Sequence, residues 1–379
     1  MLGRTLRTFG KYLIVAVVII AGVNLLAYNW WQARERGRLN LLSKRDTYLA
    51  APEDYGVVFF GDSRTFCAFH PDLLEGHLGT PSYNLSFWAN WLPTQYAYID
   101  DVAPHIAPGT VFVWSLGHVN FAAGKIRPVY PVGWPRLRKM LETGFDFADL
   151  RENLFAYTPV LWWFGYRDRI MEEVETLFDR PLWRSGPPPA VPAHGPENVA
   201  AAMAARYGAA AGVASTEVYR DGAEVASVAL YKSNGAYLRV ETKPEFYRRL
   251  QRKTVDERAE TTETFAPDLR YLELFLDSLD VLQKNGVRVV INEIEEAPHH
   301  YPSAAARDAA RAFMREYVQA AAARRGIPYV RADFDCLTDA DYFDYNHLNG
   351  VGVAKYTEMI APLLKPYLTA VDPADGAEN

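Results

Sequence analysis

The chain has 379 residues, of which 49% are hydrophobic and 23% are charged, a composition typical of globular proteins. Residues 1–45 carry a net charge of +7, which leaves −13 for the rest of a chain whose total is −6. An acidic main body argues against nucleic-acid binding, and the basic first segment favours contact with lipid headgroups. Two cysteines, Cys67 and Cys336, are too few for a disulfide framework. We expect buried free thiols, with one Cys67–Cys336 disulfide as the alternative.

An uncharged apolar run extends from Tyr12 to Trp31. Its 20 residues match the length that a helix needs to cross a bilayer, and they exceed the apolar part of a typical signal peptide. No small-residue cleavage site follows, so we predict an uncleaved membrane anchor over residues 1–31, with a cleaved signal peptide as the alternative. Basic residues flank the run on both sides and do not fix its orientation. Residues 32–54 form a charged connector to the main body.

Short buried runs then alternate with helical segments, which predicts right-handed crossovers and a mainly parallel sheet in an α/β domain. The expected strands are Gly56–Phe60, Ser82–Ser86, Thr110–Leu116, Val287–Ile294 and Ile327–Phe334. The expected helices are Thr65–Leu78 with a break at Pro71, Pro93–Ala103, Pro267–Asn285, Ser303–Arg325 and Val351–Leu368.

This alternation stops between residues 125 and 266, a stretch too long to be a plain loop. It contains helical pieces rich in Trp and Tyr, a Pro-rich bend, and short strands expected around Ser215–Tyr219, Glu224–Tyr231 and Ala236–Glu241. We therefore predict an α+β insertion, 125–266, that serves as a cap or docking subdomain. The insertion would divide the α/β domain into 55–124 and 267–370, and a disordered tail, 371–379, would follow.

Ser63 follows the first expected strand and opens the next helix. Such a strand-turn-helix unit places a serine at the edge of the sheet where parallel strands end. Asp344 and His347 lie three residues apart in the loop before the last helix, so the carboxylate can fix the imidazole tautomer while the imidazole faces the serine. We predict a Ser63–Asp344–His347 triad. The alternatives are a helix N-cap role for Ser63 and a surface or structural role for His347.

The Gly61-Asp62-Ser63 turn and the terminal Asp344-x-x-His347-Leu348-Asn349 block resemble the first and last blocks of the SGNH (GDSL-type) hydrolase and acyltransferase superfamily. The resemblance covers about Tyr55–His118 and Pro267–Leu368, and it implies a three-layer α/β/α, flavodoxin-like parallel sheet. The N-terminal anchor is similar to that of membrane-tethered acyl-transfer proteins of alginate acetylation and teichoic-acid D-alanylation. The implied location is the inner membrane, crossed once, with the catalytic domain on the periplasmic side.

The two middle blocks of the family differ from this sequence. The second block supplies a glycine N–H, but residues 83–90 contain no glycine. The third block is Gly-x-Asn-Asp, whereas the asparagine here, Asn120, comes one place late after Gly117. The resemblance implies an oxyanion hole made by the Ser63 N–H, a backbone N–H near Ser86 and the Asn120 amide. A capping or turn role is the alternative for Asn120.

Three further side chains are candidates for substrate contact: Arg64, His299 and His300. Arg64 could bind an anionic or sugar substrate, with a structural ion pair as the alternative. His299 and His300 follow the fourth expected strand, and a solvated turn is their alternative. Adjacent histidines do not easily face one metal ion, and no third ligand lies at a suitable spacing, so we predict no metal and no cofactor.

Together these features predict a membrane-anchored serine O-acyltransferase. Ser63 would accept an acyl group, expected to be acetyl, and pass it to a hydroxyl of an envelope polysaccharide. The implied partners are an acyl donor, a glycan acceptor and a membrane-bound O-acyltransferase, which the anchor would keep at high effective concentration. The alternatives are a membrane-anchored esterase or deacetylase with the same triad, and a catalytically weak scaffold of an acylation complex.

Overall fold

The computed structural model describes residues 11–12, 15, 18–26, 41–88, 90–122, 134–145, 215–221, 224–231, 234, 237–241, 267–297, 301, 303–342 and 346–368. The chain divides into two compact units, one formed by 1–43 with 126–187 and the other by 44–125 with 188–379. In the first unit, residues 18–26 are helical and α6 covers Trp134–Glu142. The boundaries proposed from the sequence, including the insertion 125–266, stay predictions.

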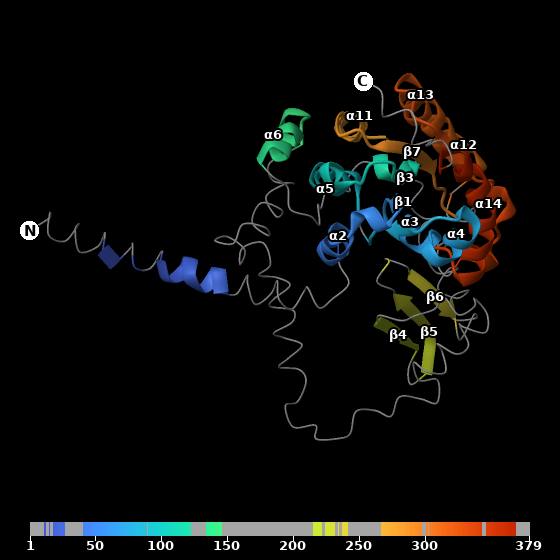
Figure 1. Ribbon diagram of the computed structural model, residues 1–379, viewed down its shortest axis with the longest axis horizontal. Coiled ribbons are helices and arrows are strands. Elements are labelled where there is room, and N and C mark those ends of the chain that lie inside the picture. The colour runs from blue at the N-terminus through green and yellow to red at the C-terminus, as the bar shows by residue number, and fades with distance from the viewer. Residues whose placement is uncertain are drawn as a thin grey trace, which may run out of the picture. The chain divides into compact units, whose positions relative to one another are not determined.

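A five-stranded parallel sheet forms the centre of the second unit (Figure 1). Its strands in chain order are β1 (Val57–Phe60), β2 (Ser82–Asn84), β3 (Val111–Leu116), β7 (Arg288–Glu293) and β8 (Tyr329–Arg331). They lie in the order β2-β1-β3-β7-β8, and every neighbouring pair is parallel. The predicted α/β class and parallel sheet are therefore confirmed.

All five strands of this sheet are shorter than the sequence suggested, and in two of them the difference has a local reason. The strand expected to reach Ser86 ends at Asn84, because the Asn84 side chain accepts a hydrogen bond from the Ser86 N–H and turns the chain. The strand expected over Ile327–Phe334 is β8 alone. Pro328 lacks an N–H to donate, and the Asp333 side chain caps a short 3-10 helix directly after the strand.

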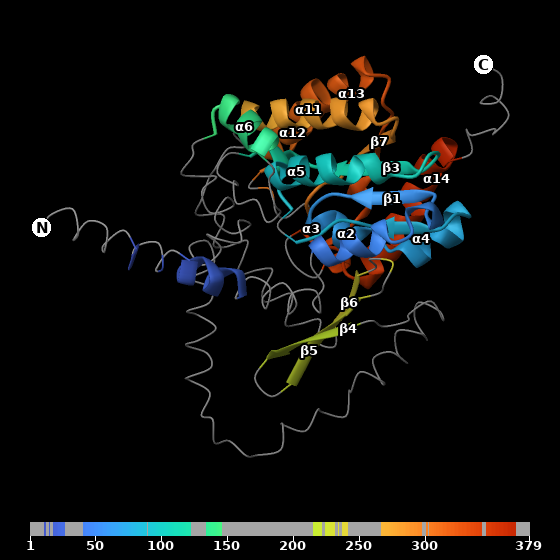
Figure 2. The same cartoon turned by 60° about the vertical axis from the view of Figure 1, so that its left-hand side comes forward.

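Helices cover both faces of the sheet (Figure 2). One face carries α5 (Leu92–Val102), α11 (Leu269–Lys284) and α12 (Ala304–Phe313), and the other carries α3 (Ser63–Ala68), α4 (Pro71–Leu78) and α14 (Gly350–Leu368). The other helices of the described residues in this unit are α2 (Leu41–Leu49), α13 (Ala320–Arg324), a π-helical turn at Met314–Gln319, and 3-10 helices at Pro52–Asp54, Ala103–His105, His118–Phe121, Phe334–Cys336 and Asp339–Asp341.

The predicted break at Pro71 is confirmed, because α3 ends at Ala68 and α4 begins at Pro71. A proline is tolerated at the first position of a helix, where its missing N–H has no intrahelical partner to lose. The helix expected over Ser303–Arg325 begins as predicted, since the Ser303 hydroxyl accepts from the Ala306 N–H at 3.1 Å. It differs in its middle, where the π-helical turn separates α12 from α13.

The core of the unit lies between the sheet and its helices. All residues of β1 and β3 are buried, which fits a parallel sheet covered on both faces. On one face, the rings of Phe59 and Phe69 stack with centroids 4.4 Å apart. On the other, Trp114 of β3 packs against Phe275 of α11 at 5.2 Å. These aromatic contacts fix the two helical layers relative to the strands that lead to the site.

A second, antiparallel sheet lies in the same unit, with β4 (Ser215–Asp221), β5 (Glu224–Tyr231) and β6 (Tyr237–Glu241) in that order. Its strands agree closely with the three predicted for this stretch. Asn234, between β5 and β6, accepts from the Asn84 N–H at 3.1 Å and donates to Asp72 at 2.7 Å. The turn is thus bonded to the edge strand of the main sheet.

Both cysteines are free, so the alternative of a Cys67–Cys336 disulfide is wrong. Cys67 is buried in α3, as expected. Cys336 is exposed, contrary to the expectation of two buried thiols, and its Sγ lies 3.3 Å from Asp333 Oδ2.

The predicted anchor, Tyr12–Trp31, falls partly outside the described residues. Across the portion of the chain that is described, no helix is both long enough and apolar enough to span a bilayer.

Two glycines of the helices α4 and α14 give a test of the packing. A Cβ on Gly352 would overlap the carbonyl oxygen of Asp341, whereas a Cβ on Gly76 meets no atom within 4 Å. We expect Gly352→Ala to lower the free energy of unfolding by about 1–3 kcal/mol through overpacking. Gly76→Ala, the control, should raise it by about 0.5–1 kcal/mol through the cost of glycine in a helix. Urea unfolding of both variants measures this, and equal stabilities would contradict the close approach at Gly352.

Candidate active site

Ser63 sits at the carboxyl edge of the sheet, the edge at which the parallel strands end. β1 ends at Phe60, and Ser63 is the first residue of α3. The helix N-cap is Asp62, whose Oδ1 accepts from the Arg64 N–H at 2.9 Å, so the alternative of Ser63 as the N-cap is wrong. A Cβ on Gly61 would lie 2.7 Å from the Ser115 carbonyl oxygen, which explains the glycine in this turn.

His347 lies just before α14, two residues from Asn349, and the Asn349 side chain is hydrogen-bonded both to α14 and to Ala340. The Asn349 side chain accepts from the Val351 and Gly352 N–H groups at 2.9 and 3.1 Å, which caps α14. Its amide also donates to the Ala340 carbonyl at 2.7 Å. His347 itself is only 7% exposed, so its imidazole is held in a restricted position.

The structure brings Ser63 and His347 together. The His347 Nε2 is 2.7 Å from the Ser63 Oγ, although 284 positions separate the two residues in the chain. This distance is within the range for proton transfer between a hydroxyl and a general base. Ser63 is half-buried, so the residue that contacts the imidazole is also partly accessible from the surface. The arrangement can therefore activate the serine as a nucleophile.

Three of the predicted site residues lie outside the described part of the chain. They are Asp344, His299 and His300. Asp344 as the partner of the imidazole Nδ1 stays a prediction, as do the substrate contacts of the two histidines. Among the residues that are described, no three His, Cys, Asp or Glu side chains are grouped so as to hold a metal ion.

Arg64 belongs to a buried ion pair rather than to the surface. Its side chain is 2% exposed, and its Nη2 lies 2.5 Å from Asp62 Oδ2. Burial alone would lower the pKa of Arg64, but the charge and hydrogen bonds of Asp62 raise it above its usual value. The structure thus shows the ion-pair alternative for Arg64, which places the guanidinium out of reach as a direct substrate contact.

Asn120 is hydrogen-bonded to both members of this ion pair. Its Oδ1 accepts from Arg64 at 2.7 Å and from the Gly117 N–H at 2.9 Å, and its Nδ2 donates to Asp62 at 3.0 Å. The side chain is 1% exposed and closes the turn after β3. It therefore has the turn role that was the alternative for this residue, with its amide directed at the ion pair.

The predicted oxyanion hole is correspondingly reduced. The Ser86 N–H already donates to Asn84 Oδ1 at 2.9 Å, so it is not available to a substrate oxygen. The Ser63 N–H makes no hydrogen bond with any described residue. The Ser63 N–H thus stays available, and a backbone N–H near Ser86, other than that of Ser86 itself, stays a prediction.

The segment between β2 and α5 supplies contacts that the sequence interpretation missed. Trp88 packs edge-on against the His347 imidazole, with ring centroids 5.0 Å apart. Asn90 donates from Nδ2 to the Gly61 carbonyl at 2.8 Å and thereby fixes the turn before Ser63. The position of this segment in the sequence could have indicated these contacts, because the residues that directly follow β2 lie at the same carboxyl edge of the sheet as Ser63.

A second set of buried groups follows β3 and β7 at this edge. His118 Nε2 lies 4.0 Å from Glu296 Oε2, and the rings of His118 and Tyr301 are 5.3 Å apart. Burial first, and then the charge of Glu296, raises the pKa of Tyr301. The sequence placed the segment that includes Tyr301 at this edge, after the fourth expected strand, but it did not indicate the contacts of His118 with Glu296 and Tyr301.

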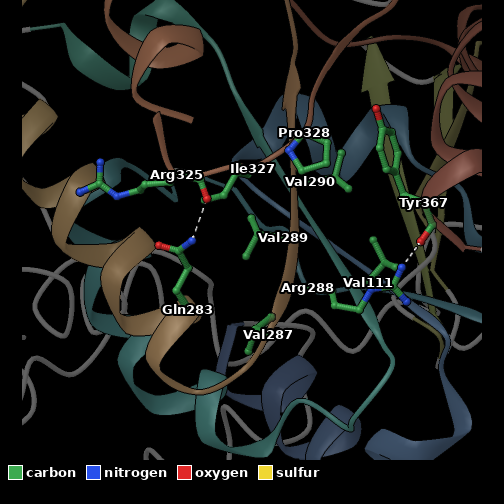
Figure 3. A pocket seen from close by; sticks show the side chains of 11 residues that line it. Val111, Gln283, Val287, Arg288, Val289, Val290, Arg325, Ile327, Pro328 and Tyr367 are labelled. Carbon is green, nitrogen blue, oxygen red and sulfur yellow. Dashed lines mark hydrogen bonds between the residues drawn. The ribbon is translucent and has the colours of Figure 1, made fainter. Parts of the chain in front are cut away.

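A pocket of about 260 Å³ lies at the opposite edge of the sheet, at the amino ends of β3 and β7 (Figure 3). Val111 and Arg288 line it, and the Arg288 guanidinium is directed at the Tyr367 carbonyl, to which it donates at 2.5 Å. Gln283 likewise donates to the Arg325 carbonyl at 3.1 Å. Because Ser63 and His347 lie at the carboxyl edge, this pocket is separate from their site.

Comparisons with known proteins add no further identification. No protein-family model matches the chain, and no curated protein matches it. The assignment of the site therefore depends on its residues and their geometry.

The buried ion pair beside Ser63 gives a second test. Asp62→Asn keeps an oxygen that can cap α3 but leaves the 2%-exposed Arg64 without its countercharge. We expect the free energy of unfolding to fall by about 3–5 kcal/mol, the usual cost of breaking a buried pair. The control is Asp46→Asn, which removes a half-exposed partner of Arg45 and should cost less than about 1 kcal/mol. Similar losses in the two variants would contradict the importance of the buried pair.

Proposed function

We propose that this protein is a membrane-anchored serine O-acyltransferase that transfers an acyl group, expected to be acetyl, to a hydroxyl of an envelope or extracellular polysaccharide. The observation that carries the proposal is the 2.7 Å contact between Ser63 Oγ and His347 Nε2 at the carboxyl edge of a parallel sheet. Nucleophile and base at this distance are the common requirement of serine acyl transfer.

In the proposed mechanism, Ser63 Oγ attacks the carbonyl carbon of the donor while His347 Nε2 takes the hydroxyl proton. The Ser63 N–H stabilises the developing oxyanion. His347 then gives the proton to the leaving group, and the acyl group stays as an ester on Ser63. An acceptor hydroxyl, deprotonated by His347, attacks this ester, and His347 returns the proton to Ser63 Oγ as the bond between Ser63 and the acyl group breaks. Asp344 is proposed to accept from the imidazole Nδ1–H and to fix the tautomer.

Two observations support the SGNH superfamily as the family of this domain. Counting only the strands of the main sheet in chain order, their spatial order is 2-1-3-4-5, which is the flavodoxin-like order. The serine follows the first of these strands and the histidine precedes the last helix, as in the terminal blocks of that superfamily. The three-layer SGNH fold, with 125–266 as its insertion, is part of the proposal.

Transfer rather than hydrolysis is favoured by the surroundings of the base. Trp88 covers one side of the His347 imidazole, and Phe66 packs edge-on against Trp88 at 5.4 Å. Apolar rings at this place limit the approach of water to an ester on Ser63. The proposed anchor would keep the domain at the periplasmic side of the inner membrane, beside a membrane-bound O-acyltransferase that supplies the donor and near its glycan acceptor.

The experiment is to incubate the full chain in detergent with 4-nitrophenyl acetate and to locate the acetyl group by mass spectrometry of peptides. We expect acetylation of Ser63, none in Ser63→Ala, and a rate lowered by about 10²- to 10⁴-fold in His347→Ala through loss of the general base. His77→Ala, which changes an exposed histidine of α4, is the control and should react as the wild type does.

Addition of an acetyl-accepting oligosaccharide then distinguishes the candidate functions. Transfer to the oligosaccharide at a rate well above release to water supports the acyltransferase. Full-rate release to water in its absence identifies a membrane-anchored esterase or deacetylase. If Ser63→Ala and His347→Ala leave both rates unchanged, the catalytic proposal fails and a scaffold role replaces it.

A further inference from the structure

Lys44 of α2 is a buried cation close to the site. Its side chain is 1% exposed, and its Nζ donates to the Ser86 carbonyl at 2.6 Å. The same Nζ lies 4.2 Å from the centre of the Phe66 ring, in cation–π contact. Lysine is almost never fully buried, so this position requires an explanation.

Burial of this group is costly. Removal of the ammonium from water lowers the pKa of Lys44 well below its usual value, and the Cys67 thiol opposes that shift only in part. The backbone around the lysine is nevertheless fixed, because the Tyr83 hydroxyl donates to the Lys44 carbonyl at 2.9 Å. The rings of Tyr48 and Tyr83, 5.6 Å apart, hold α2 against β2. The amine is therefore held at the Ser86 carbonyl by its own helix.

The hydrogen bond from Lys44 is accepted within residues 85–91, the segment between β2 and α5 that adjoins Ser63 and His347. Ser86 begins it after β2, and Asn90 near its other end donates to the carbonyl of Gly61. Trp88, between them, packs against His347. The segment is thus held at two points, by Lys44 at one end and at the turn before Ser63 at the other, while its middle contacts the base.

Phe66 joins the same contacts from the helix that carries the serine. Its ring receives the Lys44 ammonium on one side and packs against Phe87 at 5.6 Å and Trp88 at 5.4 Å. Lys44 therefore touches both α3, which begins with Ser63, and the segment that orients His347.

We propose that Lys44 is a positioning residue of the acyl-transfer site, which holds the Ser86 carbonyl so that Trp88 stays against His347. The inference rests on the proposed function and assigns to that site a residue of α2, the helix that precedes the α/β domain in the chain. Without the amine, the Ser86 carbonyl loses its donor, and the segment no longer fixes the imidazole at its 2.7 Å distance from Ser63. Small displacements of this kind lower rates by up to about 10²-fold.

The test compares three variants of the full chain. Lys44→Met removes the charge and the donor at similar length, and Lys44→Arg restores a donor. Arg45→Met is the matched control, since Arg45 is the next residue of the same helix and pairs with Asp46 and Asp101 instead. For each, kcat and KM are measured with 4-nitrophenyl acetate, and amide hydrogen exchange is measured for peptides covering residues 85–91.

We expect Lys44→Met to lower kcat by about 10- to 100-fold with KM changed by less than about twofold, because the effect is on geometry and not on ester binding. Exchange should rise in residues 85–91 and stay unchanged in the core strands. Lys44→Arg should recover at least part of kcat, and Arg45→Met should match the wild type.

The proposal is overturned if Lys44→Met keeps the wild-type kcat, or if exchange in residues 85–91 does not change. It is also overturned if the variant fails to fold, or if Arg45→Met loses as much activity, since either result assigns Lys44 to general stability. The exchange measurement separates this inference from the proposed function. If the wild-type chain is not acetylated at Ser63, the proposed acyltransferase is disproved. Amide hydrogen exchange in Lys44→Met still shows whether Lys44 fixes residues 85–91.

Discussion

The parallel pairing of β1 with β3 is the constraint on which the site depends. Phe60 lies opposite Trp114, so the two strands end close together and the turns that follow them meet. β7 continues the same register, with Leu116 opposite Glu293. Because parallel strands end at one edge, segments far apart in the chain deliver their next residues to one place. Ser63, Asn120 and the loop before α14 meet there for this reason.

The ion pair of Asp62 and Arg64 gives this edge its rigidity. A buried pair of this kind does little for net stability, since the desolvation of two charges offsets their attraction. It does fix geometry, because Asp62 caps α3 and binds Arg64, and Asn120 bonds to both. The turn after β1 is thereby bonded to the turn after β3. A serine that must meet a base held by another loop needs a turn fixed in this way.

The contact between Ser63 and His347, the candidate catalytic pair, could be predicted from the sequence because its signals are local. An apolar run followed by Gly61 and Ser63 specifies a strand, a turn and a helix, and His347 precedes an amphipathic last helix. Arg64, Asn120 and Ser86 could not be assigned in the same way, because each has two possible partners and tertiary packing chooses between them. The alternative that Ser63 caps α3 is wrong because the N-cap is Asp62, one residue earlier, whose side chain accepts from the Arg64 N–H.

Lys44 was hidden from sequence analysis for a different reason. A lysine in a basic, membrane-proximal stretch is expected to face water or lipid headgroups, yet this side chain is buried against Phe66 and the Ser86 carbonyl. Lys44, Asp62 and Arg64 are buried close to Ser63. In the pocket at the opposite edge, Arg288 donates to the carbonyl of Tyr367. Among the described residues, costly burial of this kind beside Ser63 marks a place where geometry matters more than stability, which is what the proposed acyl transfer would require.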